Sequence, residues 1–458
     1  MYIMKSKKQW LTLPAKVALS FLGGILFGTF LLCLPISSST GQWWSFIDAF
    51  FTSTSAVCVT GLVVVDTAVH FSLFGQIVLM ILIQIGGLGF ITLSVLLLLW
   101  AGKKLSFKSR MALQESLNRD SSSGVVALLK KIAALVFSIE GIGFVLLLPS
   151  MVVQFGASGI FKALFLSISA FCNAGFDILG TTGMQFQSLA PFAKNVFVLL
   201  PIMFLIVLGG LGYTVILEII GKKDKEKRKI FTFHAKVVLI MTAILIFGGA
   251  ILFAIFEWNN PATIGNMTPL EKIMNSFFQS ITPRTAGFST FDQADLTSSS
   301  RVITNILMFI GGSPTSTAGG IKTTTIFVLL MFAFKSSTDK GEVIVNKKSV
   351  SSKTVQKCLR LVALVIIMVI SATILICLLE KNNPMASSSS VIFEVISAIS
   401  TVGITLGLTP TLGVISKLII ITLMFVGRVG MLTIAFAFKH KSQDAYGMIQ
   451  YPDSKINV

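Results

Sequence analysis

The chain has 458 residues, of which 54% are hydrophobic and only 12% are charged, and its mean hydropathy is +0.86. This composition excludes an ordinary soluble domain and predicts an all-α integral membrane protein. The net charge is +18, but 28 of the 37 Lys and Arg residues lie in five segments: 1–16, 102–131, 218–236, 335–360 and 439–458. We interpret this as the positive-inside pattern, which places both termini in the cytoplasm and argues against nucleic-acid binding.

Apolar stretches in chain order predict eight membrane-spanning helices. Six exceed the roughly 20 residues that a spanning helix needs, at 12–35, 72–100, 127–153, 191–219, 235–257 and 413–438. Two more, at 301–334 and 357–380, are interrupted or slightly polar but long enough. The first stretch is longer than a secretory signal core, so we expect it to be retained. Shorter apolar segments lie within each pair, at 44–56, 158–170, 269–281 and 388–398, and they fit four re-entrant helices.

A loop with a central glycine follows each of these shorter segments. The loops read AVCVTGL at 56–62, AFCNAGF at 170–176, TPRTAGF at 282–288 and AISTVGI at 398–404. Their glycines, Gly61, Gly175, Gly287 and Gly403, lie 114, 112 and 116 residues apart. Four equivalent loops in one membrane chain can surround a common axis, where backbone carbonyls can replace the hydration shell of a cation. The repeat therefore predicts a pseudo-fourfold pore.

A second glycine motif recurs in the apolar stretch after each loop. It reads IGGLGF at 85–90, LGGLGY at 208–213, IGGS at 310–313 and VGRVG at 426–430. Two markers in register predict four helix–pore loop–helix repeats, with boundaries at 1–115, 116–228, 229–345 and 346–458. We expect the second helix of each repeat to bend or pack tightly at its Gly pair, and close helix packing alone is the alternative.

The third copy departs from this pattern in segment 311–325. Two Gly pairs, a proline and many small polar residues disfavour a continuous helix there. Irregular backbone at membrane depth is tolerated where protein buries it or water bathes it, so we expect this segment to line the cavity and act as a gate. A static kink is the alternative. The candidate gate residues are Gly311, Gly312, Ser313, Pro314, Thr315, Ser316, Thr317, Ala318, Gly319, Gly320 and Lys322, together with Arg428 of the fourth copy.

Arg428 takes the place that Gly87, Gly210 and Gly312 hold in the other copies. Insertion of an arginine at mid-membrane costs about 2.5–3.5 kcal/mol, and such residues usually face a bundle interior or water. We expect Arg428 to raise the barrier to cation passage. A structural ion pair with Glu140 is the alternative, and Lys322 could snorkel or pair with a carboxylate.

Enzyme activity has little support in the sequence. Phosphate-binding loops and dinucleotide fingerprints are missing, and the three histidines, His70, His234 and His440, lack ligand spacing. Five scattered cysteines argue against a disulfide framework or a zinc site. We therefore expect no cofactor in this chain, and any control by ATP or ADP would act through a partner that docks on 102–131, 218–236 or 335–360.

The motifs at 282–288, 311–325 and Gly427-Arg428 resemble those of the Trk/Ktr/HKT superfamily of potassium transporters, and the similarity covers nearly the whole chain. The chain looks most like the Ktr-type bacterial membrane subunit. The resemblance implies a gating loop at 311–325, a barrier at Arg428 and a potassium selectivity filter made of four short stretches. These are Val59, Thr60, Gly61 and Leu62; Asn173, Ala174, Gly175 and Phe176; Thr285, Ala286, Gly287 and Phe288; and Thr401, Val402, Gly403 and Ile404.

The same resemblance implies a homodimer in the plasma membrane, controlled by a cytoplasmic ring of nucleotide-binding regulatory subunits. Glycine at position 61 favours potassium, because serine there accompanies sodium preference in some plant relatives. Asp66, Asp177, Asp292 and Glu394 could concentrate cations at the outer mouth, although ordinary loop solvation explains them as well. The sequence therefore predicts gated potassium uptake and leaves sodium dependence open; a cation-coupled symporter of another solute is the alternative.

Overall fold

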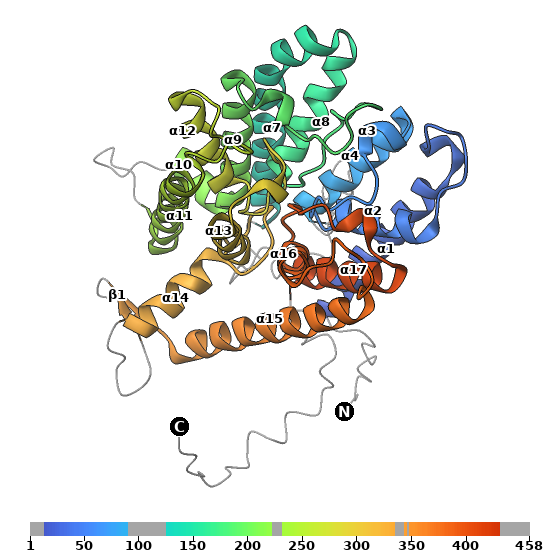
Figure 1. Ribbon diagram of the computed structural model, residues 1–458. Coiled ribbons are helices and arrows are strands. Elements are labelled where there is room, and N and C mark those ends of the chain that lie inside the picture. Colours follow the sequence, from blue (N-terminus) through green and yellow to red (C-terminus); the bar gives the residue numbers. More distant parts are fainter. Residues whose placement is uncertain (1–12, 90–124, 222–230, 335–342, 346–347, 431–458) are drawn as a thin grey trace, which may run out of the picture.

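The computed structural model describes residues 13–89, 125–221, 231–334, 343–345 and 348–430 (Figure 1). Both predicted cytoplasmic termini, most of the basic segments, and the ends of the predicted spans at 90–100 and 431–438 lie outside these residues. Within the described ranges the chain is almost entirely helical. Its two strands, β1 (Val343–Val345) and β2 (Lys348–Val350), pair antiparallel.

The helices fall into four consecutive groups. The first comprises α1 (Leu13–Cys33), α2 (Phe46–Val57), α3 (Thr67–His70) and α4 (Leu73–Leu88). The second comprises α7 (Val125–Phe155), α8 (Ser158–Cys172), α9 (Val196–Leu211) and α10 (Tyr213–Ile220). The third comprises α11 (Phe233–Glu257), α12 (Pro269–Ile281), α13 (Ser298–Phe309) and α14 (Thr323–Phe334). The fourth comprises α15 (Ser352–Leu379), α16 (Ser388–Ile399) and α17 (Val414–Val429). Four 3₁₀ turns lie at Pro35–Ser37, Ala190–Phe192, Gln293–Asp295 and Thr409–Thr411.

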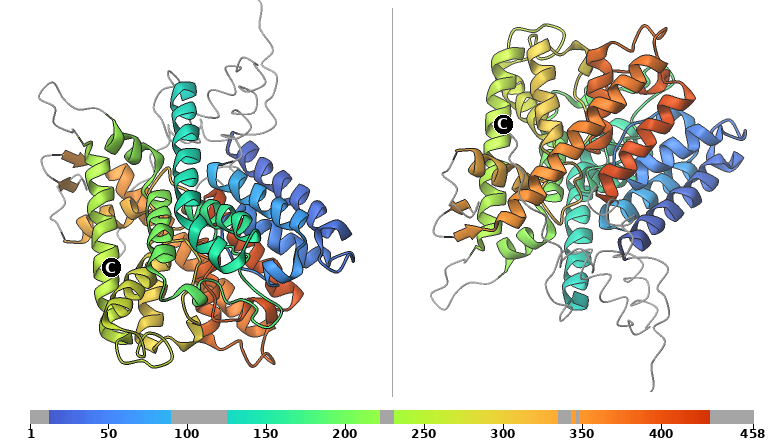
Figure 2. Two further views of the ribbon diagram at one scale, coloured as in Figure 1. Left: turned by 90° about the horizontal axis from the view of Figure 1, so that it is seen from above. Right: turned by 90° about the horizontal axis from the view of Figure 1, so that it is seen from below.

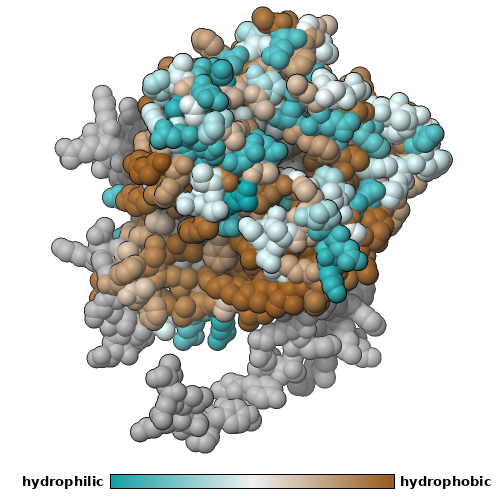
Figure 3. Space-filling model, viewed as in Figure 1, coloured by the Kyte–Doolittle hydropathy of each residue, from teal (hydrophilic) through white to brown (hydrophobic). Residues whose placement is uncertain are grey.

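Four described helices are long and apolar enough to cross a membrane: Ala15–Cys33, Val126–Phe155, Phe233–Glu257 and Ser352–Leu379. The pair α9 and α10, bent by 105°, counts as a fifth if the two helices together form one broken span. Helices satisfy their own backbone hydrogen bonds, which a bilayer requires. Exposed apolar side chains such as Ile367, Ile370 and Ile374 lie along α15. Figure 3 shows hydrophobic residues gathered along that helix. This surface suits lipid.

The short helices α2, α8, α12 and α16 each pack against the long helix that precedes them in the chain, namely α1, α7, α11 and α15. Each also packs against a helix from the neighbouring group. The contacts run α4 to α8, α9 to α12, α13 to α16 and α17 to α2. This order is cyclic, because the last group returns to the first. In both views of Figure 2, the first group and α11 accordingly lie on opposite sides of the molecule.

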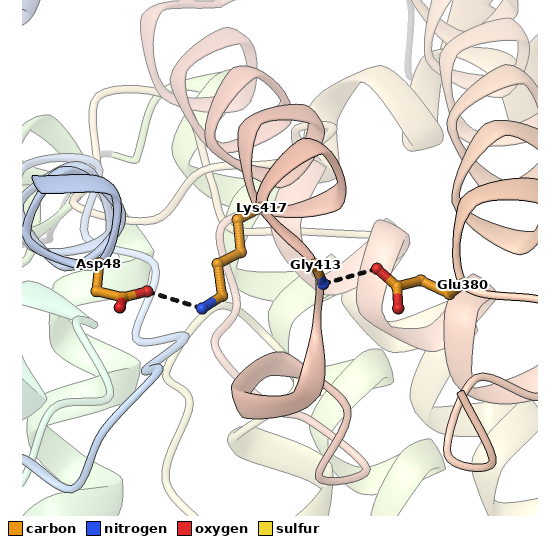
Figure 4. Close-up of polar contacts among 4 residues, drawn as sticks. All are labelled: Asp48, Glu380, Gly413 and Lys417. Carbon is orange, nitrogen blue, oxygen red and sulfur yellow. Dashed lines mark hydrogen bonds and ion pairs between the residues drawn. The ribbon is translucent and has the colours of Figure 1, made fainter. Parts of the chain in front are cut away.

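An ion pair lies where the last group meets the first. Lys417 Nζ of α17 is 2.7 Å from Asp48 Oδ1 of α2, and both side chains are largely shielded from solvent. Beside it, Glu380 accepts a 2.7 Å hydrogen bond from the Gly413 N–H, which ties the end of α15 to the start of α17 (Figure 4). The Lys417–Asp48 contact therefore joins the last helix group to the first, across more than 360 residues of sequence.

In three of the four copies a glycine of the second glycine motif ends the helix. Gly89, Gly212 and Gly430 end α4, α9 and α17 with φ of 82°, 93° and 93°. We expected a bend or tight packing at the Gly pair: Gly86-Gly87 and Gly209-Gly210 stay helical and pack tightly, whereas Gly311-Gly312 lie in irregular backbone after α13. In three copies a Cβ on the first glycine of the motif would collide with a carbonyl at the C-terminal end of a short helix: Gly86 with Val57 O, Gly209 with Phe171 O and Gly427 with Ile399 O. Only glycine fits this approach.

Candidate functional site

The four glycine loops share one backbone conformation. Two residues before each glycine, a non-glycine residue has positive φ: Val59 56°, Asn173 59°, Thr285 68° and Thr401 51°. The glycines themselves have φ of 95°, 70°, 83° and 92° for Gly61, Gly175, Gly287 and Gly403. A left-handed non-glycine residue costs about 1–2 kcal/mol, so the surrounding structure must impose it at all four positions.

The four loops meet in a closed ring. A Cβ built on Gly61 would lie 2.5 Å from Ala174 O, and one on Gly175 would lie 2.8 Å from Ala286 O. The next contact is 2.6 Å, from Gly287 to Val402 O, and Gly403 would collide with Thr60 O. Each glycine therefore faces the carbonyl before the next glycine. The predicted filter residues are all buried except Gly287, which is partly exposed.

Hydroxyl groups at the C-terminal end of each short helix fix these loops from behind: three lie in the last turn and Thr282 is the C-cap of α12. Ser55 Oγ accepts a 3.1 Å hydrogen bond from Gly61 N, and Ser397 Oγ does the same for Gly403. In the other two loops the hydroxyl donates at 2.6 Å to the carbonyl after the glycine: Ser169 to Phe176 and Thr282 to Phe288. Sequence reasoning missed these residues, although a serine six positions before the glycine in three loops was a visible signal.

A cavity of about 570 Å³ opens above the ring, and all four glycines lie in its wall. Asp66, Asp177 and Asp292 also line it. Asp66 is committed to structure, because it caps α3 and accepts a 2.7 Å hydrogen bond from Phe186 N. Desolvation in the cavity wall raises the pKa of Asp177 to about 6. The acidic residues are therefore not equivalent.

Glu394 does not lie at the mouth, contrary to the expectation that it belongs with these aspartates. Its side chain is 1% exposed and sits within α16, behind the fourth loop. The burial of Glu394 could not be read from its apolar neighbours Phe393 and Val395. A carboxyl between apolar residues is equally typical of an amphipathic helix whose polar face is exposed.

The segment 310–322 separates α13 from α14 and lies beneath the ring. Its backbone is held by the break between α9 and α10: Ser313 N donates to Gly210 O at 3.0 Å and Thr317 N to Gly209 O at 3.2 Å. On its other side, Gly319 is so close to Thr401 that a Cβ would overlap the threonine hydroxyl. The predicted gate residues are thus brought together with the end of α9 and the fourth glycine loop.

Arg428 connects this segment to the first group of helices. Its Nη1 donates to Thr317 O, while its Nη2 donates to Gly86 O and lies 3.5 Å from Gly87 O. Glu140 instead accepts hydrogen bonds from Gln84 Nε2 at 3.0 and 3.1 Å. Within the described residues Arg428 and Glu140 form no ion pair, so that alternative is wrong.

Lys322 likewise binds backbone rather than a carboxylate. Its Nζ donates to Ala318 O at 2.7 Å, within the same segment. Two basic side chains, Arg428 and Lys322, are therefore bound to carbonyls of the segment beneath the ring. Backbone carbonyls such as those of the ring can coordinate a dehydrated cation, and a positive charge close to such a site repels one.

Comparison with known proteins gives independent evidence on the family of this chain. The family described as "TrkH: Cation transport protein" matches residues 20–448. The chain is 40% identical to the potassium/sodium uptake protein NtpJ of Enterococcus hirae, over 100% of this chain and 99% of that protein. It is 39% identical to the Ktr system potassium uptake protein B of Bacillus subtilis, over 97% and 96% of the two chains.

The fold also matches a solved structure. The potassium transporter TrkH from Vibrio parahaemolyticus superposes with a TM-score of 0.70 at 17% identity, covering 94% of this chain and 86% of that one. At this identity the likeness concerns the fold alone.

Proposed function

The chain belongs to the TrkH family of cation transport proteins and is Ktr B-like within it, and from this premise we propose that it takes up potassium through a selectivity filter formed by the four glycine loops. The observation that carries the proposal is the closed ring at the base of the cavity, where each glycine faces the carbonyl of the next loop. The names of the similar proteins, which include potassium uptake proteins from two genera, support the choice of ion.

Family and apolar helices indicate a multi-pass protein of the plasma membrane. We further propose eight spanning and four re-entrant helices in four repeats with boundaries at 1–115, 116–228, 229–345 and 346–458, with both termini cytoplasmic. The cyclic packing order of the short helices supports four equivalent units. A symporter built from two inverted halves would not produce this order, which argues against the alternative function.

We propose that segment 311–325 is the gate and that Arg428 holds it closed. In support, the arginine binds Thr317 of the segment and Gly86 of the opposite helix α4 at once. The segment also makes backbone hydrogen bonds to the broken helix pair α9 and α10, whose 105° bend leaves carbonyls free to accept them. Release of one arginine would free the segment on its α4 side.

The likeness to Ktr system proteins also supports a partner. We propose that the chain is the ion-translocating subunit of a homodimer, regulated by a cytoplasmic nucleotide-binding ring that supplies any response to ATP or ADP. The name of the Enterococcus hirae protein, which includes sodium, makes sodium dependence the first property to measure.

Growth of a potassium-uptake-deficient bacterium at low potassium tests the proposal. Expression of this chain, with a Ktr-type regulatory subunit supplied, should restore growth, and uptake should be measured with and without sodium. Failure to restore growth while the protein is present in the membrane would exclude potassium uptake as its function.

A further inference from the structure

Three of the four short helices are tied by polar side chains to the segment that follows their own glycine loop, and each tie differs. In the second group, Lys162 Nζ donates to Ile178 O at 2.9 Å. In the third, Gln279 and Gln293 are joined by a 2.7 Å hydrogen bond. In the fourth, the tie is the carboxyl of Glu394. The backbone of the ring repeats four times, but the side chains that hold it from outside differ from group to group.

Of these three ties, only the one in the fourth group is made by a carboxyl. Glu394 Oε2 accepts a 2.7 Å hydrogen bond from Thr405 Oγ1, and Oε1 accepts one from Thr409 Oγ1. Within the described part of the chain Glu394 has no ion-pair partner. A carboxylate accepts hydrogen bonds and donates none, so two hydroxyl donors match it. A buried group of this kind is costly unless satisfied, which fixes the donors firmly.

These donors control the outer end of the fourth glycine loop. Thr405 lies two residues after Gly403, lines the cavity, and accepts a 3.1 Å hydrogen bond from Gly407 N. Thr409 is fully buried and begins the 3₁₀ turn Thr409–Thr411. The carboxyl of Glu394 thus holds the chain at both ends of 405–409, just above the ring.

The position is peculiar to the fourth copy. Nine residues before the other loop glycines stand Thr52, Leu166 and Phe278, none of them acidic. A purely structural requirement of the short helix would apply to all four copies. We propose that Glu394 is a positioning residue that sets the geometry of the fourth glycine loop and thereby the discrimination between potassium and sodium; this rests on the proposed function.

The test compares variants in purified, reconstituted protein. Glu394→Ala removes both acceptors and should lower the potassium-over-sodium uptake ratio about a hundredfold, because the loss of each hydrogen bond to a charged group corresponds to about a factor of ten. Glu394→Gln keeps one acceptor and should lower it less. Glu380→Gln is the matched control for Glu394→Gln, because Glu380 is a carboxylate of the same group that accepts its hydrogen bond from the Gly413 N–H and lies away from the ring. It should leave the ratio unchanged.

The threonines provide a second arm that leaves Glu394 in place. Thr409→Val should lower the potassium-over-sodium ratio, and Thr409→Ser, which keeps the hydroxyl, should restore it. Unchanged ratios in folded Glu394→Ala and Thr409→Val protein would overturn the proposal, as would an equal loss with Glu380→Gln. Wild-type protein that transports no potassium in the same assay would instead refute the proposed function.

Discussion

Replacement of Arg428 with alanine should raise basal potassium flux. The guanidinium donates to Thr317 O and Gly86 O, and a hydrogen bond from a charged donor contributes about 1.5–3 kcal/mol. Loss of both would favour release of segment 311–325 by about 3 kcal/mol. Since about 1.4 kcal/mol is a factor of ten, the flux should rise about a hundredfold, or about tenfold where water takes over part of the lost bonding.

The assay is potassium uptake into proteoliposomes containing this chain without a regulatory partner. Arg428→Lys serves as the matched variant, because it keeps the charge but offers no planar fork to two carbonyls, and it should give an intermediate flux. Elution as a single species and an unchanged melting temperature establish that each variant is folded. A flux equal to or below that of the wild type in folded Arg428→Ala protein would refute the closing role of the arginine.

Three further predictions follow from named contacts. Ser55→Ala leaves Gly61 N without its acceptor and should raise the half-saturating potassium concentration about fivefold, as about 1 kcal/mol implies; an unchanged potassium dependence of uptake would contradict it. Deletion of 315–318 removes the carbonyl that Arg428 binds, so it should raise basal flux without adding to the effect of Arg428→Ala, and additive effects would argue for separate gates. Lys417→Met and Asp48→Asn should each lower thermal stability in detergent, with a coupling of about 1 kcal/mol in the double variant, whereas independent effects would exclude the ion pair as a stabilising contact.

Sequence reasoning reached much of this arrangement because repetition is visible without a structure. The short helix α12 occupies Pro269–Ile281, the range predicted from its apolar pattern. The loop glycines also lie where their spacing placed them, whereas the irregular segment predicted at 311–325 ends at 322, because α14 begins at Thr323. Glycine and proline announce backbone geometry directly, since each restricts or permits torsions on its own.

Side-chain partners could not be predicted in the same way. The sequence offered Glu140 as a partner for Arg428, yet the arginine binds carbonyls contributed by segments more than 100 and 340 residues away. Glu394 was assigned to the mouth because polarity alone does not reveal which face of a short helix is buried. Partners of this kind depend on the tertiary structure, which brings together backbone groups that carry no sequence signature.

The most direct test of the account is the potassium-over-sodium flux ratio of reconstituted protein carrying a serine at one loop glycine. Gly61→Ser should lower this ratio, because φ of 95° strains any other residue and a Cβ would lie 2.5 Å from Ala174 O. Gly248→Ser in α11 is the control, since a Cβ there would meet no atom within 4 Å. A lowered ratio for Gly61→Ser alone is the predicted result; an unchanged ratio in folded protein would contradict the assignment of selectivity to the ring.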